Sequence, residues 1–160
     1  PALLRKARAM AHRATKDTPI GPVTITEEDG AIVALDFGGG AGETAPTPLL
    51  ERAFGELEEY FAGTRKTFDL PLNPRGTPFQ RKVWEALRAI PYGETRSYRD
   101  IAVAAGCPKG FRAVGMANNR NPIAIFIPCH RVIGSDGSLV GYGGGLPIKQ
   151  FLLDLERRHA

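Results

Sequence analysis

The feature that most constrains this chain is an apolar run that ends abruptly at a reactive dipeptide. Residues 123–127 are Ile-Ala-Ile-Phe-Ile, and Pro128, Cys129 and His130 follow directly. Proline fixes φ and lacks a backbone donor, so the sequence predicts a rigid bend with the thiol just after it, outside any regular element. An accessible thiolate of low pKa beside an imidazole is a common nucleophile at neutral pH. Cys129 is therefore a candidate nucleophile, and a buried structural cysteine beside an unrelated histidine is the alternative.

Composition sets broad limits on the class of protein. The 160 residues suit one domain or two small ones, and an apolar content of 42% is enough for a core. Two cysteines make neither a disulfide framework nor a zinc quartet, which favours a reducing compartment. The chain has no apolar run of eighteen residues and no secretory pattern, so we expect no membrane partner. These features predict a cytoplasmic protein, or a nuclear one in a eukaryote. A net charge of +4 is compatible with nucleic-acid binding.

The first half indicates a small α+β unit. Residues 20–26 and 31–37 are rich in β-branched residues and flank the turn Glu28-Asp29-Gly30, so they predict a hairpin. A helix is expected to open at Thr47 or Pro48 and to end by Gly63, because apolar residues recur between them at helical spacing.

The ends of this half are less regular. The basic segment 1–16 is interpreted as a solvated helix or a frayed terminus, with phosphate binding as an alternative. Residues 67–72 alternate and predict a third short strand, and residues 73–76 suit a linker. We therefore predict an N-terminal domain over residues 1–75, without an evident catalytic group, and a second domain over residues 76–160.

The second half is predicted to be mostly helical. Thr77 and Pro78 suit the start of a helix over residues 79–90. Ser97 then caps a helix over residues 98–105, and a turn containing Gly106 leads to another helix over residues 110–118. Two helices joined by such a turn are typical of a helix-turn-helix, although an ordinary helical hairpin has the same pattern. In the second helix we expect three residues to face inward and Arg112 to face outward; the three are Phe111, Val114 and Ala117.

A glycine-rich loop over residues 134–145 follows the Cys-His pair. It lacks the Gly-Lys-Ser/Thr ending of a phosphate-binding loop, so its glycines are better suited to forming a wall around a flat ligand, with Tyr142 in its middle. A last helix over residues 148–159 is expected to bury Phe151, Leu152 and Leu155. Glu156 faces either solvent or the site.

The residues described so far resemble one family. Pro128-Cys129-His130-Arg131-Val132, preceded by Arg112-Ala113-Val114-Gly115 and by Asn121-Pro122, is similar to the O6-alkylguanine-DNA alkyltransferases, also called methylated-DNA–protein-cysteine methyltransferases. The resemblance is strongest from Thr77 to the end. It implies an α+β protein in which a small ribonuclease-H-like sheet and helix domain precedes a winged-helix-like domain with the helix-turn-helix.

The resemblance also implies an activity and a partner. The protein would repair double-stranded DNA that contains O6-alkylguanine, as a monomer and without cofactor or metal, by moving the alkyl group irreversibly to Cys129 after base flipping. O4-alkylthymine is a second substrate that the resemblance suggests. His130 would act as the base through a water, and Glu156 would fix its tautomer. Asn121 would join the recognition helix to an active-site strand, and Tyr98 would crowd the phosphate and donate to guanine N3.

Further positions would contact DNA or the base. Arg112 would enter the base stack, while the carbonyls of Cys129 and Val132 would accept from the exocyclic amine. The other implied DNA contacts are Ala113, Gly115, Asn119 and Arg120, and the other implied pocket residues are Asn118, Val140, Tyr142 and Gly143. Lys109, Arg99 and Arg131 flank this face as basic positions, and Arg131 has a structural role as its alternative.

The chain departs from the family pattern near the pocket. Phe111 and Asn118 replace a small and an apolar residue, Val140 is bulkier than the Gly of some members, and Gly143 is smaller than their Ser. We therefore expect a benzyl group to be accepted less readily than methyl.

Three other functions fit parts of the pattern. A lesion-binding protein that does not react typically lacks the cysteine that is present here. A methyl-sensing regulator would carry a fused zinc domain. A Cys-His hydrolase would need an oxyanion-hole motif, which the sequence does not display.

Overall fold

The computed structural model describes residues 11–39 and 42–160. The chain divides into two compact units after Pro74, one residue before the boundary that the sequence suggested. Each unit is described by itself. In the described ranges, no helix combines the length and the apolar character that crossing a membrane requires.

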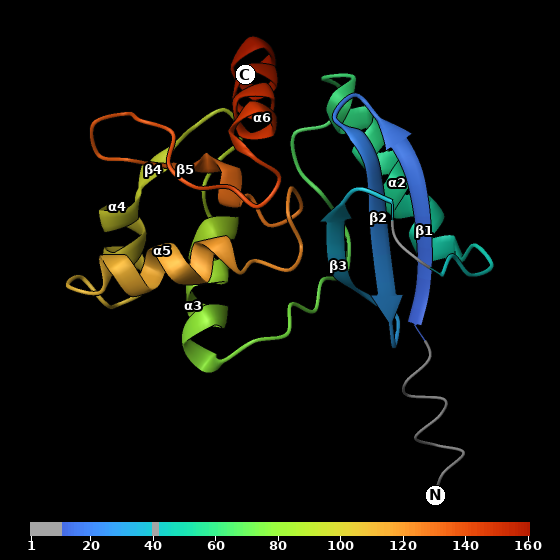
Figure 1. The fold of residues 1–160 in the computed structure, drawn as a ribbon, viewed down its shortest axis with the longest axis horizontal. Coiled ribbons are helices and arrows are strands. Elements are labelled where there is room, and N and C mark those ends of the chain that lie inside the picture. The colour runs from blue at the N-terminus through green and yellow to red at the C-terminus, as the bar shows by residue number, and fades with distance from the viewer. Residues whose placement is uncertain (1–10, 40–41) are drawn as a thin grey trace, which may run out of the picture. The chain divides into compact units, whose positions relative to one another are not determined.

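The first unit is a three-stranded antiparallel sheet with one long helix (Figure 1). Strands β1 (Ala11–Thr18), β2 (Gly21–Glu28) and β3 (Ala31–Phe37) lie in the order β1-β2-β3, and helix α2 (Pro48–Phe61) packs against β1 and β2. The hairpin and the helix that the sequence predicted are present. The core between them is apolar and includes Val23, Ile25, Ile32, Leu35, Leu50, Ala53, Leu57 and Tyr60.

Strand β1 corrects one prediction. Residues 11–16 were expected in a helix or a frayed terminus, but they pair with β2 along their whole length. The strand lies at the edge of the sheet and none of its residues is fully buried, so it lacks the alternation that identifies a half-buried strand. The rest of the predicted terminal segment, residues 1–10, lies outside the described residues.

The predicted strand over residues 67–72 is wrong in extent. The segment makes one parallel bridge, between Leu72 and Ile32: the Ile32 N–H donates to the Pro71 carbonyl at 2.8 Å, and the Asn73 N–H donates to the Ile32 carbonyl at 2.8 Å. Pro71 has no N–H to donate, which limits a longer ladder.

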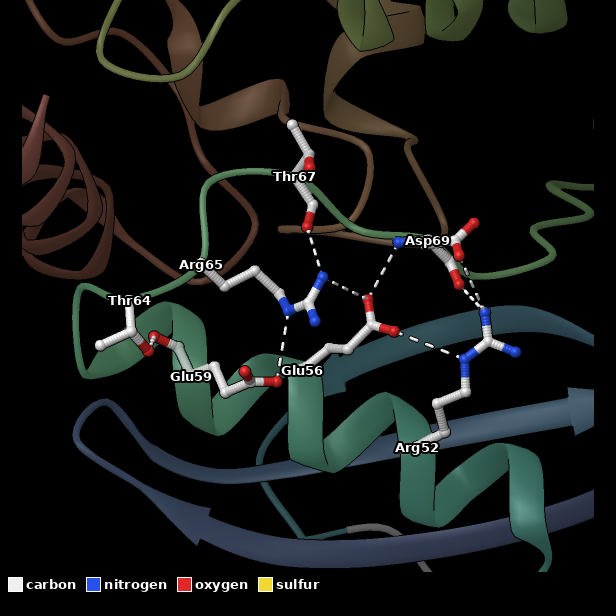
Figure 2. Close-up of polar contacts among 7 residues, drawn as sticks. All are labelled: Arg52, Glu56, Glu59, Thr64, Arg65, Thr67 and Asp69. Carbon is white, nitrogen blue, oxygen red and sulfur yellow. Dashed lines mark hydrogen bonds and ion pairs between the residues drawn. The ribbon is translucent and has the colours of Figure 1, made fainter.

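Side chains from α2 hold this segment instead (Figure 2). The Glu56 carboxylate, only 6% exposed, accepts from the Asp69 N–H at 2.9 Å and pairs with Arg52 at 3.4 Å and Arg65 at 3.5 Å. The two arginines also donate to backbone carbonyls, Arg52 to that of Asp69 and Arg65 to that of Thr67. Apart from the bridge to Ile32, the polar backbone of the segment is therefore satisfied by side chains, those of Arg52 and Glu56 on α2 and that of Arg65 just after it.

The second unit contains four helices and a two-stranded parallel sheet. Helices α3 (Pro78–Arg88) and α4 (Tyr98–Ala104) each begin with a capping box, at Thr77 and at Ser97. Helices α5 (Phe111–Asn119) and α6 (Leu146–His159) follow, and β4 (Arg96–Ser97) pairs with β5 (Val132–Ile133). Helix α5 packs against α3 and α4. The fold class predicted from the sequence, α+β with a sheet and helix domain before a helical domain, is confirmed.

Trp84 anchors the core of this unit. Its ring is 1% exposed and its indole N–H donates to the Ala117 carbonyl near the end of α5 at 2.9 Å.

Two residues that the sequence predicted to face the core are not buried. Phe111 is 39% exposed, because it is the first residue of α5 and lies at the edge of the core, where the Arg99 guanidinium stacks over its ring at 5.3 Å. Phe151 is half-buried rather than buried.

Replacing Glu56 with alanine is expected to lower the free energy of unfolding of the first unit by about 1–3 kcal/mol, because the Asp69 N–H and two arginines lose the buried carboxylate that they share. Urea unfolding followed by circular dichroism measures this loss. Glu59→Ala is the matched control, since Glu59 lies on the same helix with a side chain 51% exposed and an ion pair to Arg65. It should change stability by less than about 1 kcal/mol. Equal effects of the two substitutions would show that Glu56 is not the organising group.

Candidate active site

A tight buried turn delivers Cys129. The Phe126 N–H donates to the Ala124 carbonyl and the Ile127 N–H to the Ile123 carbonyl, both at 2.9 Å. Ile125 has φ 73°, which is unusual for a β-branched residue and persists only where the surrounding structure enforces it. The active-site strand implied by the family resemblance is therefore a turn in this chain. Cys129 begins a short 3₁₀ helix, η1 (Cys129–Arg131), and is not outside regular structure as Pro128 had suggested.

Asn121 connects this turn to the end of α5. Its side-chain amide donates to the Ile127 carbonyl at 2.8 Å, and its side-chain oxygen accepts from the Ile123 N–H at 3.0 Å. The same side chain also hydrogen-bonds the Cys129 thiol. One amide therefore bonds both ends of the turn and lies beside the candidate nucleophile, and the family resemblance implied that this residue joins the recognition helix to the site.

The thiol differs from the accessible, low-pKa nucleophile that the sequence predicted. Cys129 is 5% exposed, and burial raises its pKa to about 11, against the opposing effects of the Asn121 hydrogen bond and the positive charge of Lys149. Burial disfavours the thiolate because an anion loses its hydration there. In this state the thiol is neutral at pH 7, so reaction requires a base.

A buried ion cluster lies beside the thiol. The Glu156 carboxylate is 2.6 Å from His130 Nε2, and it accepts from Arg131 Nε at 2.7 Å and from the Gly93 N–H at 3.2 Å. Glu156 is 1% exposed, which settles the open question of its direction in favour of the site. Burial alone would raise the pKa of Glu156, but the His130 hydrogen bond and the Arg131 charge together hold it well below its usual range.

This cluster determines the proton on His130. Burial lowers the pKa of His130, which outweighs the opposite effect of Glu156, so the ring is neutral at pH 7. Because Glu156 is ionised and can only accept, Nε2 must carry the ring proton. Nδ1 then has a lone pair, and in residues 11–39 and 42–160 this buried atom has no hydrogen-bond partner. A neutral imidazole with one such nitrogen is equipped to accept a proton.

Arg131 proves structural. Its side chain is 7% exposed, and it donates to Glu156 and to the Ile90 carbonyl, the latter at 2.7 Å. It is therefore not available to contact a phosphate, and the structural alternative offered by the sequence is the correct one.

Lys149 is a buried residue of the candidate site that sequence reasoning missed. It is fully buried, and its ammonium donates to the carbonyls of Val132 at 2.6 Å and Val140 at 3.1 Å. Burial lowers its pKa, while nearby Cys129 acts in the opposite direction. A lysine on a helix is ordinarily interpreted as a solvated residue, and only its place three residues before the buried pair Leu152–Leu153, on the same face of α6, could have indicated otherwise.

Two tyrosines flank the thiol. Burial raises the pKa of Tyr98 and of Tyr142, and in both cases a charge on Cys129 acts in the same direction, so both phenols lie within electrostatic range of the thiol. The Tyr98 hydroxyl donates to the Val140 carbonyl at 2.9 Å. The Val132 carbonyl, implied as an acceptor for the base, already accepts from Lys149, so only its second lone pair remains for a ligand.

The other predicted pocket residues differ in how far they are buried. Asn118 is 2% exposed, and its side-chain oxygen has no hydrogen-bond partner within the described part of the chain. Val140 is 49% exposed, so its inward group is the carbonyl. Gly143 is exposed on the same loop.

Helix α5 presents a mixed surface, on which the exposed apolar side chains of Phe111 and Met116 lie among polar and basic ones. Four of the predicted DNA contacts on or next to it are exposed, and these are Arg112, Ala113, Asn119 and Arg120. Gly115 is half-buried, and a Cβ there would lie 3.7 Å from the Tyr98 ring, so the tyrosine packs against the helix. Lys109 and Arg99 are also exposed beside it. The described ranges contain no group of three His, Cys, Asp or Glu residues suited to a metal ion.

Comparison with known proteins shows the family. The 6-O-methylguanine DNA methyltransferase ribonuclease-like domain matches residues 11–74, and the DNA binding domain of the same family matches residues 78–158. The chain therefore belongs to the methylated-DNA–protein-cysteine methyltransferase family.

Individual relatives agree with this assignment. Methylated-DNA–protein-cysteine methyltransferases of Methanosarcina barkeri and Bacillus subtilis are each 52% identical, over 89% and 92% of this chain and 95% and 96% of their own lengths. A crystal structure of Mycobacterium tuberculosis O6-methylguanine methyltransferase superposes with a TM-score of 0.85, at 48% identity over 94% of this chain and 95% of that one. A structure of the M. tuberculosis protein in complex with DNA has the same TM-score, at 49% identity over 93% and 94% of the two chains.

Acidification is expected to destabilise the second unit. The pKa values of Glu156 and His130 are lower in the folded protein than in the unfolded chain, so unfolding takes up protons. The stabilising contribution of His130 is present above its unfolded pKa of about 6.5, and that of Glu156 above about 4.3. Both are lost as the pH falls, so the free energy of unfolding should decrease from pH 7 to pH 4.

Urea unfolding at pH 7, 5.5 and 4 measures this dependence. Asp154→Asn, which removes a half-exposed carboxylate from the same helix, should leave the dependence unchanged, whereas His130→Asn, which removes the imidazole that charges on unfolding in this range, should weaken it. Stability that stays constant or rises on acidification would contradict the described ion cluster.

Proposed function

We propose that this protein repairs double-stranded DNA by transferring an alkyl group from O6 of guanine to the sulfur of Cys129. The observation that carries the proposal is the buried Glu156–His130 pair directly beside the cysteine, with His130 Nδ1 left to accept a proton. Family membership and the names of close relatives support the same reaction.

The chemistry follows from the state of each group. His130 takes the thiol proton through a water, and the thiolate attacks the alkyl carbon. The new bond is S–C, the broken bond is C–O6, and the electrons of that bond leave with the guanine, which finally gains the proton that the thiol lost. Tyr98 donates to guanine N3 and so makes the base a better leaving group. Asn121 holds the sulfur and the turn behind it in place.

Burial of the thiol has a further consequence for the substrate. The O6 atom of a stacked base cannot reach a sulfur that is 5% exposed, so the damaged nucleotide rotates out of the duplex into the site. Arg112, exposed on α5, fills the space that the base leaves.

A thioether is not reversed by these groups, so each protein molecule reacts once. The protein acts without a cofactor, as a monomer, in the compartment that holds the DNA, and O4-alkylthymine is a second substrate.

Intact-protein mass spectrometry tests the reaction. We expect the protein mixed with a duplex that carries one O6-methylguanine to gain one methyl group per molecule, located on Cys129. Cys129→Ser is the control and should gain none, and Cys107→Ser removes the other thiol and should react normally. Tight lesion binding without methyl gain would indicate a lesion-binding protein that does not react. The absence of both methyl gain and lesion preference would overturn the proposal entirely.

A further inference from the structure

One carbonyl in the glycine-rich loop receives two donors from different helices. The Val140 carbonyl accepts from the Tyr98 hydroxyl at 2.9 Å and from the Lys149 ammonium at 3.1 Å. Tyr98 is the first residue of α4, and Lys149 lies in the first turn and a half of α6. This carbonyl therefore ties loop 134–145 to both helices.

Tyr98 and Lys149 differ in the number of hydrogen bonds that each can donate. A phenol has a single proton to donate, so Tyr98 cannot donate to Val140 and to a base at the same time. Engaging a flipped guanine therefore costs Tyr98 its hydrogen bond to the loop. The Lys149 ammonium has three donors. It can keep its hydrogen bond to Val140 when a base binds, because its other donors are held by the carbonyls of Val132 at 2.6 Å and Gly141 at 3.5 Å.

The loop has a third contact at the recognition helix. Gly141 adopts φ +53°, and a Cβ at this position would lie 3.3 Å from the Asn119 side chain at the end of α5. The segment around Val140 and Gly141 thus lies between the helix expected to bind DNA and the buried lysine. Tyr98 contacts this segment directly through its hydrogen bond to the Val140 carbonyl.

We propose that the Tyr98–Val140 hydrogen bond is a latch that holds loop 134–145 in place in the DNA-free protein and opens when Tyr98 donates to the flipped base. Lys149 is the positioning residue that keeps the loop anchored in both states. The role of the base rests on the proposed function, whereas the latch in the DNA-free protein does not.

Hydrogen exchange of loop 134–145 in the DNA-free protein tests the latch first. Tyr98→Phe removes only the hydroxyl and should raise amide exchange in the loop by about five-fold, the effect of one ordinary hydrogen bond. Tyr60→Phe, which removes a hydroxyl from the first unit, is the matched control and should leave the loop unchanged. Equal loop exchange in wild type and Tyr98→Phe would overturn the latch, whatever the protein does with DNA.

The opening is tested in an unreactive background. Cys129→Ser is compared with the double variant that also carries Tyr98→Phe, each with a saturating O6-methylguanine duplex. The difference in loop exchange between these two proteins should disappear, because the Tyr98 hydroxyl is engaged elsewhere. A difference that persists in the bound state would overturn the opening step. Failure to bind the lesion would count against the proposed function but would leave the DNA-free result intact.

Lys149→Met tests the anchoring role. The variant should raise amide exchange in loop 134–145 above that of wild type, both in the DNA-free protein and with bound duplex, because the carbonyls of Val140 and Gly141 lose their shared donor. Unchanged loop exchange would contradict the anchoring role, even if methyl transfer slows through loss of the Lys149 charge near Cys129. Exchange at the Trp84 indole N–H, which donates to Ala117 in the core, reports whether the variant remains folded.

Discussion

The buried carboxylate of Glu156 is the interaction on which the rest of the catalytic unit depends. A carboxylate that is 1% exposed loses most of its hydration, and only strong partners offset that loss. Here His130 and Arg131 supply them from consecutive positions of η1, and Arg131 extends the cluster to the Ile90 carbonyl after α3. One anion therefore fixes α6, the 3₁₀ helix and the end of α3 relative to one another. Because Cys129 precedes these two residues directly, the cluster also fixes the sulfur.

Burial of Cys129 explains how its thiol can be unreactive in the free protein and still available for the proposed reaction. A neutral thiol with a pKa raised to about 11 resists oxidation and stray alkylation, since the thiolate is the reactive form. In the proposed reaction, deprotonation is left to the neutral imidazole of His130, whose orientation the carboxylate maintains. Lys149 and Asn121 lie near the sulfur and favour its anion, so the site already holds part of the stabilisation that the thiolate needs. If each molecule reacts once, as proposed, this arrangement is favourable, because every unproductive reaction of the thiol would consume a molecule.

Local signals made much of the fold predictable, and long-range burial limited the rest. The helix starts at Thr47, Thr77 and Ser97 follow from capping chemistry within three residues of sequence, and the structure has all three. The Cys-His pair identified the candidate site because Cys129 and His130 are also adjacent in sequence. Strand β1 was missed because an edge strand of half-buried polar residues has no alternation. Lys149 was missed, and the direction of Glu156 left open, because only the packing of α6 against residues far away in sequence buries them.

The most direct test of this account is the protonation state of His130, measured by ¹⁵N nuclear magnetic resonance of the imidazole nitrogens at pH 7. The account predicts a neutral ring with its proton on Nε2, directed at Glu156, and an unprotonated Nδ1. His159 lies on the same helix as Glu156, and its Nδ1 is 2.8 Å from the Leu155 carbonyl, which can only accept, so it provides an internal reference for a protonated Nδ1. A His130 ring protonated on Nδ1, or on both nitrogens, would contradict the claim that a buried carboxylate prepares this histidine to accept the proton of Cys129.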